Sequence, residues 1–196
     1  MNYYKLGVNP DSGKWKGYMN PGSFLLDEKG NEFSDVKLSR LQGEFSGTLY
    51  FNILKEGEVP PVISIGSRFL AFNKNVFCAD EFDLAGIQLI PLINKENDFE
   101  YMLMHIFNYI DCVDWDGSKI DRWPENYIPE DWESKRGRFF IEPVLYREKI
   151  SKNLDVFRLY DWGGAFNIVI TETFKEKLLS VGFDNTLLDF KILSLK

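Results

Sequence analysis

Acidic and aromatic side chains gather in one segment of the sequence, residues 111–133. Eight acids and only two bases, Lys119 and Arg122, give this segment a net charge of 2 − 8 = −6, out of −7 for the whole chain. Three of the five tryptophans also lie in it. In protein–protein contacts, tryptophan rings often supply much of the binding energy, and charges of one sign steer a partner of the opposite sign. We therefore predict a binding surface for a basic protein, with these contact residues: Asp114, Trp115, Asp116, Asp121, Trp123 and Trp132.

The same segment has a plainer interpretation, in which it is a solvated loop whose tryptophans fold back onto the domain. The sequence leaves both interpretations open. A calcium loop is not predicted, because the twelve-residue EF-hand loop requires glycine at position 6 and glutamate at position 12. Counted from Asp114, position 12 is Glu125, but position 6 is Lys119. We predict no metal site.

Candidates for catalysis are few. The single histidine, His105, lies in the most apolar run of the chain, where a structural role is the usual one. Cys112 follows Asp111, and a neighbouring carboxylate disfavours the reactive thiolate. Glycine-rich phosphate-binding motifs are absent. We therefore expect no catalytic residue and no cofactor, and predict that the protein is not an enzyme.

Two other functions stay open at this point. The first is a small hydrolase or ligand-binding enzyme in which the sheet brings Asp111 and Glu142 together for acid–base work. The second is a structural subunit of a larger assembly, which would bind proteins without neutralising them.

Composition limits the partners and the compartment. A net charge of −7 disfavours nucleic acid, because a phosphate-binding surface needs an excess of lysine and arginine. No apolar run is long enough for a membrane helix, and the first residues lack the basic and apolar stretches of a signal peptide. Two cysteines do not make a disulfide framework. We expect a cytoplasmic protein with reduced thiols and no membrane partner.

The elements that must position the acidic segment are mainly strands. Residues 86–93 and 98–110 read as strands, and the second is apolar on both alternating faces, which places it in the middle of a sheet. The clearest helix covers residues 172–181, with Thr173 and Glu176 as a capping box and Gly182 as its stop. A short helix is predicted after Ser67, a second after Asp80, and a hairpin turn at 162–164. Further strands are predicted over residues 3–8, 48–54, 138–146, 155–161, 165–171 and 186–193.

These elements predict an α+β fold: a mostly antiparallel sheet with a few short helices, forming a single domain. Residues 1–60 are expected to be a loop-rich, β-containing N-terminal part. Residues 61–196 are expected to form the α+β core. A chain of 196 residues is long enough to bury a core without disulfides.

Several short motifs in the second half follow one another in the order found in a bacterial family. They are Tyr-Ile-Asp-Cys-Val-Asp at 109–114, Ser118 and Trp123, Phe-Ile-Glu-Pro-Val-Leu at 140–145, Phe-Arg-Leu at 157–159 and Ile-Val-Ile-Thr-Glu at 168–172. Together with Tyr-Tyr-Lys-Leu at 3–6, this order resembles the eleventh family of predicted immunity proteins of polymorphic toxin systems, first catalogued as a domain of unknown function. The resemblance covers residues 62–193 well and 1–60 poorly. The chain departs from the family at 181–186, where the usual Gly-Leu-Thr-Gly ending is missing. The forty-third immunity family shares the architecture and is the alternative.

The resemblance implies a cytoplasmic immunity protein that binds a cognate toxin domain and blocks it sterically, without turnover. Many toxins of these systems are nucleases with a basic active-site face, so the implied partner is a toxin protein such as a basic nuclease domain. An acidic patch can compete for such a face as a phosphate mimic.

Overall fold

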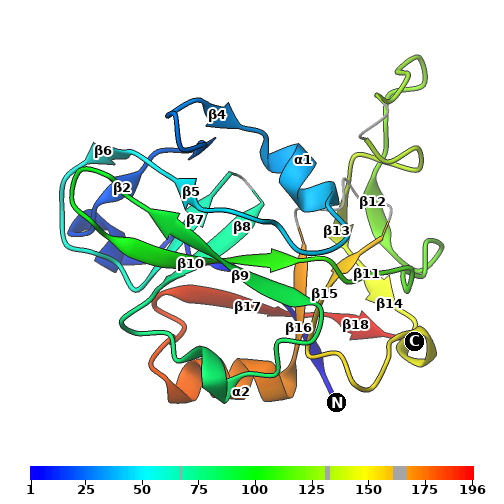
Figure 1. Ribbon diagram of the computed structural model, residues 1–196. Helices are drawn as coiled ribbons and strands as arrows, with labels where there is room; N and C mark the ends of the chain where they lie inside the picture. Colours follow the sequence, from blue (N-terminus) through cyan, green and yellow to red (C-terminus); the bar gives the residue numbers. More distant parts are fainter. Residues whose placement is uncertain (67, 131–132, 161–166) are drawn as a thin grey trace.

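Strands dominate the structure, and short helices accompany them (Figure 1). The computed structural model describes residues 1–66, 68–130, 133–160 and 167–196. The predicted α+β class is confirmed, and the described strand pairs are antiparallel except for β5–β9, β11–β15 and β14–β18. The strands are β1 (Tyr3–Val8), β2 (Asn20–Pro21), β3 (Leu25–Leu26), β4 (Glu32–Phe33), β5 (Leu49–Tyr50), β6 (Ile53–Lys55), β7 (Val62–Ile65), β8 (Phe69–Asn73), β9 (Ile87–Ile93), β10 (Glu100–Ile106), β11 (Tyr109–Ile110), β12 (Lys119–Asp121), β13 (Phe139–Glu142), β14 (Val144–Leu145), β15 (Val156–Leu159), β16 (Ile168–Thr171), β17 (Leu188–Ile192) and β18 (Ser194–Leu195). The helices are α1 (Asp35–Arg40) and α2 (Glu172–Ser180), with 3-10 turns η1 (Gly13–Lys16), η2 (Ala79–Glu81) and η3 (Arg147–Lys149).

One sheet has five described strands in the order β11-β15-β16-β1-β17. The N-terminal strand β1 lies inside it, with Lys5 opposite Val169 of β16 on one side and Lys191 of β17 on the other. The predicted N-terminal part, residues 1–60, therefore supplies a strand to the sheet that is otherwise built from the second half of the chain. It also supplies β3, β4 and β5 to the other large sheet.

That second sheet has seven described strands in the order β4-β3-β5-β9-β10-β8-β7. Its interior strand β10, between β9 and β8, is apolar on both faces, as predicted. Met104 and Ile106 are buried in one hydrophobic cluster, and Tyr101 and Leu103 are buried in another on the opposite face. Alternate residues of a strand point to opposite faces, so a strand with both sets apolar must have packed layers on both sides.

The predicted strand over residues 98–110 is interrupted. β10 ends at Ile106, and after it the chain crosses to the five-stranded sheet, where β11 pairs in parallel with β15. The backbone of Asn108 makes the crossing, since its carbonyl accepts a hydrogen bond from the N–H of Arg158 at 2.8 Å.

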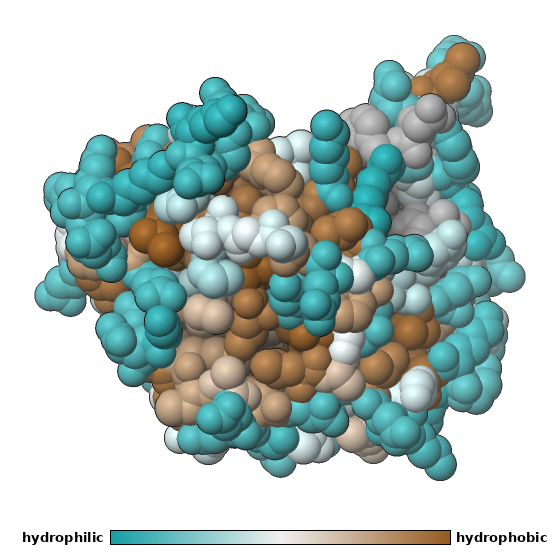
Figure 2. All heavy atoms as spheres, in the orientation of Figure 1, coloured by the Kyte–Doolittle hydropathy of each residue, from teal (hydrophilic) through white to brown (hydrophobic). Residues whose placement is uncertain are grey.

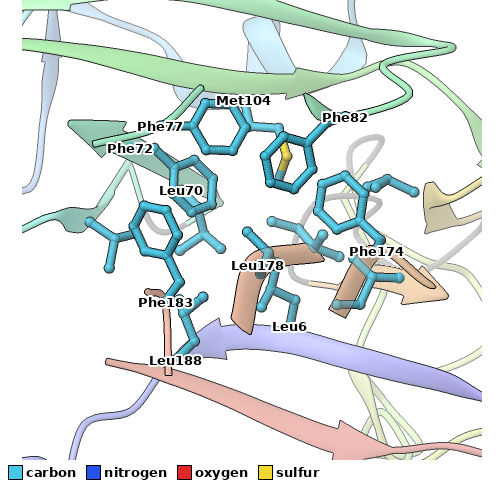
Figure 3. Packing of buried hydrophobic residues seen from close by; sticks show 14 of the residues in the cluster. Leu6, Leu70, Phe72, Phe77, Phe82, Met104, Phe174, Leu178, Phe183 and Leu188 are labelled. Atoms are coloured by element: carbon cyan, nitrogen blue, oxygen red, sulfur yellow. The ribbon is translucent and has the colours of Figure 1, made fainter. Parts of the chain in front are cut away.

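The largest hydrophobic cluster lies between the two large sheets (Figure 3). Phenylalanines from loops fill its centre. The ring of Phe77 stacks between Phe72 and Phe82, at centroid distances of 4.8 and 4.6 Å. From below, α2 contributes Phe174 and Leu178, both fully buried. Burial of this many rings joins the two sheets into one packed interior.

The predicted C-terminal helix is confirmed as α2, but its cap is different. Thr171, rather than Thr173, is the N-cap, and its hydroxyl accepts a hydrogen bond from the N–H of Phe174 at 3.2 Å. Gly182, at φ 97°, follows the helix end as predicted. No helix in the described ranges is long and apolar enough to cross a membrane.

The helix predicted after Ser67 is wrong. The chain there forms strand β8, in which residues 69–72 are all buried between β7 and β10. Pairing on both edges and burial on both faces outweigh a local capping signal. The helix predicted after Asp80 is also wrong, because the chain there forms only the 3-10 turn η2, which includes Asp80. The predicted turn at 162–164 lies outside the described residues.

Candidate protein-binding arm

The acidic segment continues into a protrusion, which we call the arm: residues 119–142, of which 131 and 132 are not described. Its stem is the antiparallel pair β12–β13, and Figure 1 shows the arm standing off the two large sheets at the upper right. The N–H of Arg138 donates to the carbonyl of Asp121 at 2.7 Å and continues this pairing. Gly137 is required here, because a Cβ at this position would lie 2.7 Å from Cγ2 of Ile120.

Trp123 braces the upper part of the stem. Its ring stacks on Tyr127 at a centroid distance of 4.4 Å, and its indole N–H donates to the carbonyl of Ser134 at 2.8 Å. On the same side, the guanidinium of Arg138 lies 5.9 Å from the Trp123 ring and 3.3 Å from a carboxylate oxygen of Asp121. Two of the predicted contact residues, Asp121 and Trp123, thus hold the arm together from within.

The outer loop of the arm is braced by Glu133. Its carboxylate accepts hydrogen bonds from the hydroxyl of Tyr127 at 2.7 Å and from the N–H of Glu130 at 2.8 Å. The bond to this carboxylate raises the pKa of the Tyr127 phenol, because it stabilises the protonated form. The ammonium of Lys135 donates to the carbonyls of Pro129 and Glu130, at 3.1 and 3.3 Å.

An apolar side chain projects from this braced loop. Ile128 is 86% exposed, which is more than any other large hydrophobic residue described, and its neighbour Tyr127 is 40% exposed. Figure 2 shows apolar surface at the far end of the protrusion, bordered by hydrophilic surface. Water contact with an isoleucine costs free energy that burial in a partner would recover. Hydrogen bonds from Tyr127 and Glu130, on either side of Ile128, to Glu133 fix the loop that carries this side chain.

Acids surround Ile128 in the sequence. Residues 124–133 contain no lysine or arginine and four acids, of which the structure describes Glu125, Glu130 and Glu133. Of the bases that follow, Lys135 donates to carbonyls of the outer loop, and the two arginines lie further down the arm. Arg138 pairs with Asp121, and the guanidinium of Arg136 lies 4.0 Å from the ring centroid of Trp115. Among the described residues, the outer loop therefore carries three acids, Glu125, Glu130 and Glu133, and one base, Lys135, above a stem of mixed charge.

Of the remaining predicted contact residues, Asp114, Trp115 and Asp116 lie below the arm in the turn after β11. Trp132 is not among the residues that the structure describes. Asp114 has a side chain only 4% exposed, and its carboxylate accepts from the Lys196 ammonium at 2.8 Å and from the N–H of Gly117 at 3.2 Å. The hydrogen bond from Lys196 lowers the pKa of Asp114. Asp116 is exposed.

Trp115 is half-buried and packs inward. Its ring contacts that of Phe140 at a centroid distance of 4.8 Å, on the edge of the hydrophobic cluster that contains Phe140 and Cys112. Asp114 and Trp115 therefore stabilise the base from which the arm projects. The geometry offers them little surface for a partner.

The carboxylates of the enzyme alternative are on the surface. Asp111 is exposed, and Glu142 has a side chain 65% exposed that pairs with Lys119 at 3.6 Å. Acid–base work by a carboxyl pair needs at least one desolvated carboxyl. These two are not placed in such an environment. In the described ranges, no three His, Cys, Asp or Glu side chains are grouped to hold a metal ion.

The other two candidates for chemistry are inside the protein. His105 is fully buried in β10, where Nε2 lies 3.1 Å from the carbonyl oxygen of Gly43, and burial lowers its pKa. Burial and the charge of Asp111 raise the pKa of the Cys112 thiol to about 12. A thiol with such a pKa is inert near neutrality.

Ile128 is the feature that sequence reasoning missed. A single isoleucine between Tyr127 and Pro129 is an unremarkable signal, whereas tryptophans among acids are conspicuous. The one sequence signal for its exposure is the pair of prolines in the Pro124–Glu130 loop, which lie on either side of Ile128 and disfavour regular structure there.

Two comparisons with known proteins found no match. The chain matches no protein-family model, and a search of curated proteins found no similar sequence.

Proposed function

We propose that this chain is an inhibitory protein-binding module of the immunity type, and that the arm inserts its tip into a hollow on a basic toxin domain. The observation that carries the proposal is the exposure of Ile128, 86%, on a loop that is braced from within. The order of motifs in the second half, which resembles an immunity family, supports the same function.

The tip combines the two properties that such a contact needs. Complete burial of an isoleucine side chain contributes about 1.5–3 kcal/mol. The acids on the tip provide long-range attraction to a basic face and speed up association. Because Trp123, Glu133 and Lys135 already hold the loop, little conformational entropy is lost when a partner binds.

The direct test uses the toxin-like C-terminal region encoded by the neighbouring reading frame. This region is expressed with and without the present chain, and growth and co-purification are followed. Rescue of growth with a stable 1:1 complex is the expected result. Toxicity that this chain does not relieve, or a harmless neighbour, would contradict the immunity function.

A pair of matched variants then tests the arm. Ile128→Ala is expected to weaken the complex by about 2 kcal/mol, roughly 30-fold in Kd. Leu54→Ala is the control, because Leu54 is 69% exposed on β6, away from the arm, and should leave Kd unchanged. Equal affinities for the two variants would remove the tip from the interface even if rescue occurs.

The acids make a separate, kinetic contribution. Glu125→Gln combined with Glu130→Gln is expected to slow association at low salt and to reduce its salt dependence, with a smaller change in dissociation. Stopped-flow measurements at two ionic strengths distinguish this steering from a direct contact.

A further inference from the structure

The first third of the chain encloses a cavity that the arm does not use. Its volume is about 520 Å³, within the roughly 300–1,000 Å³ that small-molecule sites occupy. The walls come from the chain around η1, from the paired strands β2 and β6, and from β7. Figure 1 shows β2 and β6 at the left of the molecule and the arm at the upper right.

One wall of the cavity is aromatic and held in place. Trp15 and Tyr18 pack edge to face at a centroid distance of 5.7 Å, and both are half-buried against the large hydrophobic cluster between the sheets. The indole N–H of Trp15 donates to the carbonyl of Asn9. Met19 and Ile63, which are almost completely buried, also line the cavity. The rings are therefore in position before a ligand binds, and they suit a planar, largely apolar body.

The charged side chains that line the cavity are both lysines. Lys16 follows Trp15, and Lys55 lies on β6 opposite Asn20 of β2. Both lysines are exposed, and neither forms an ion pair with a residue that the structure describes. No acid is among the described residues that line the cavity, although the chain carries a net charge of −7. A hollow lined by charges of one sign concentrates ions of the opposite sign, so this one favours an anion.

Uncharged hydrogen-bonding groups complete the lining. Ser64 is the exposed residue of β7, whose other three residues are buried. Ser23 and Asn20 are exposed on the same cavity, from β2 and the turn that follows it. Hydroxyl and amide groups can donate to the oxygens of a phosphate or a carboxylate. A few polar groups placed around an apolar lining are the usual composition of a ligand site.

We propose that this cavity binds a small organic anion with a planar ring. The ring lies against Trp15 and Tyr18, and the acidic group, a phosphate or a carboxylate, is held by Lys16 and Lys55. A neutral aromatic compound would leave the lysines unused, and an anion without a ring would leave the aromatic wall in water. This activity is additional to the proposed immunity function and does not rest on it.

Calorimetric titration of the whole chain with four probes tests both requirements. Adenosine monophosphate and naphthoate each carry a ring and an acidic group, as a phosphate and a carboxylate respectively. Adenosine has only the ring system and ribose phosphate only the charged group. At least one of the first two is expected to bind with a submillimolar Kd, and the last two at least about tenfold more weakly. Whichever of the first two binds more tightly identifies the acidic group.

Variants locate the site for the probe that binds. Lys16→Gln combined with Lys55→Gln should weaken binding about tenfold. Lys29→Gln combined with Lys152→Gln is the matched control, because these lysines are exposed outside the cavity, and Kd should not change. Ser64→Phe places a ring in the cavity from an exposed position and should abolish binding. Circular dichroism checks that each variant is folded.

Binding should also be visible at Trp15 itself. Its indole N–H resonance, assigned with Trp15→Phe, should shift when the probe is added, whereas that of Trp115 in the other half of the chain should not. The proposal is overturned if neither ring-bearing anion binds, if adenosine or ribose phosphate binds equally well, or if the two lysine pairs give equal affinities. Binding that survives Ser64→Phe would place the ligand elsewhere and also overturn it. None of these measurements involves a toxin, so they are separate from the test of the arm.

Discussion

Replacing Trp123 by alanine should loosen the arm and leave the rest of the protein intact. Trp123 contacts Tyr127, Ser134 and Arg138, all of them within the arm, and it belongs to none of the hydrophobic clusters of the two sheets. Its removal therefore affects the difference in free energy between a braced and an open arm. The free energy of global unfolding should change little.

The magnitude follows from the contacts that are lost. A stacked ring pair contributes about 0.5–1.5 kcal/mol, and a hydrogen bond another 0.5–1.5 kcal/mol. Local opening of the arm should become easier by about 1–3 kcal/mol, which is roughly 5- to 150-fold in the opening equilibrium. Trp123→Phe retains a ring but loses the indole N–H, so its opening equilibrium should lie between those of wild type and Trp123→Ala.

Hydrogen exchange of backbone amides is the assay. The N–H groups of Tyr127, Glu133 and Arg138 are bonded within the arm and should exchange faster in the variant, while amides of β10 should not. Trp115→Ala is the contrast, since that ring packs on Phe140 and its loss should reduce global stability by about 2–3 kcal/mol. Accelerated exchange in β10, or a melting temperature lowered as much as by Trp115→Ala, would refute the view of Trp123 as a brace of the arm.

Three further predictions concern the body of the protein. Phe77→Ala removes a ring stacked on both faces and should reduce the free energy of unfolding by about 3–5 kcal/mol, measured by urea titration; a loss below about 1 kcal/mol would contradict the packing. The pKa of Asp114 is lowered in the folded state, so its contribution to stability is present above the unfolded value near 3.9 and is lost as pH falls through the folded pKa. The free energy of unfolding of Asp114→Asn should therefore differ from that of wild type at pH about 6, and the two values should converge in acid. A difference that is constant across this range would contradict the ion pair with Lys196. Exposed Cys78 should react with a thiol reagent in the native protein while buried Cys112 reacts only on unfolding, and simultaneous labelling would contradict that burial.

Much of the fold could be predicted from local sequence. The strand at 100–106 was recognised because both alternating sets are apolar, and α2 because Phe174 and Leu178 recur at helical spacing before Gly182. The failures have a common cause. At 69–73 the local sequence carries a helix-capping signal, but pairing with β7 and β10 makes the segment a strand. The crossing at Asn108 depends on a hydrogen bond from Arg158, which lies 50 residues further along the chain.

The candidate site was located in the sequence but only partly understood. Residue types alone identified the acidic and aromatic segment and showed how little the chain offers for catalysis. Sequence could not show that Asp114 bonds to Lys196, a partner 82 residues away, or that Trp123 faces inward while Ile128 faces water.

What the sequence determined by itself is therefore the chemistry that is present and the local period of its strands and helices, since both depend on a residue and its near neighbours. Tertiary structure decided which acids share a surface and which ring is exposed. Exposure and pairing depend on contacts between distant segments, and here the stem β12–β13 carries Ile128 and the acids Glu125, Glu130 and Glu133 away from the core.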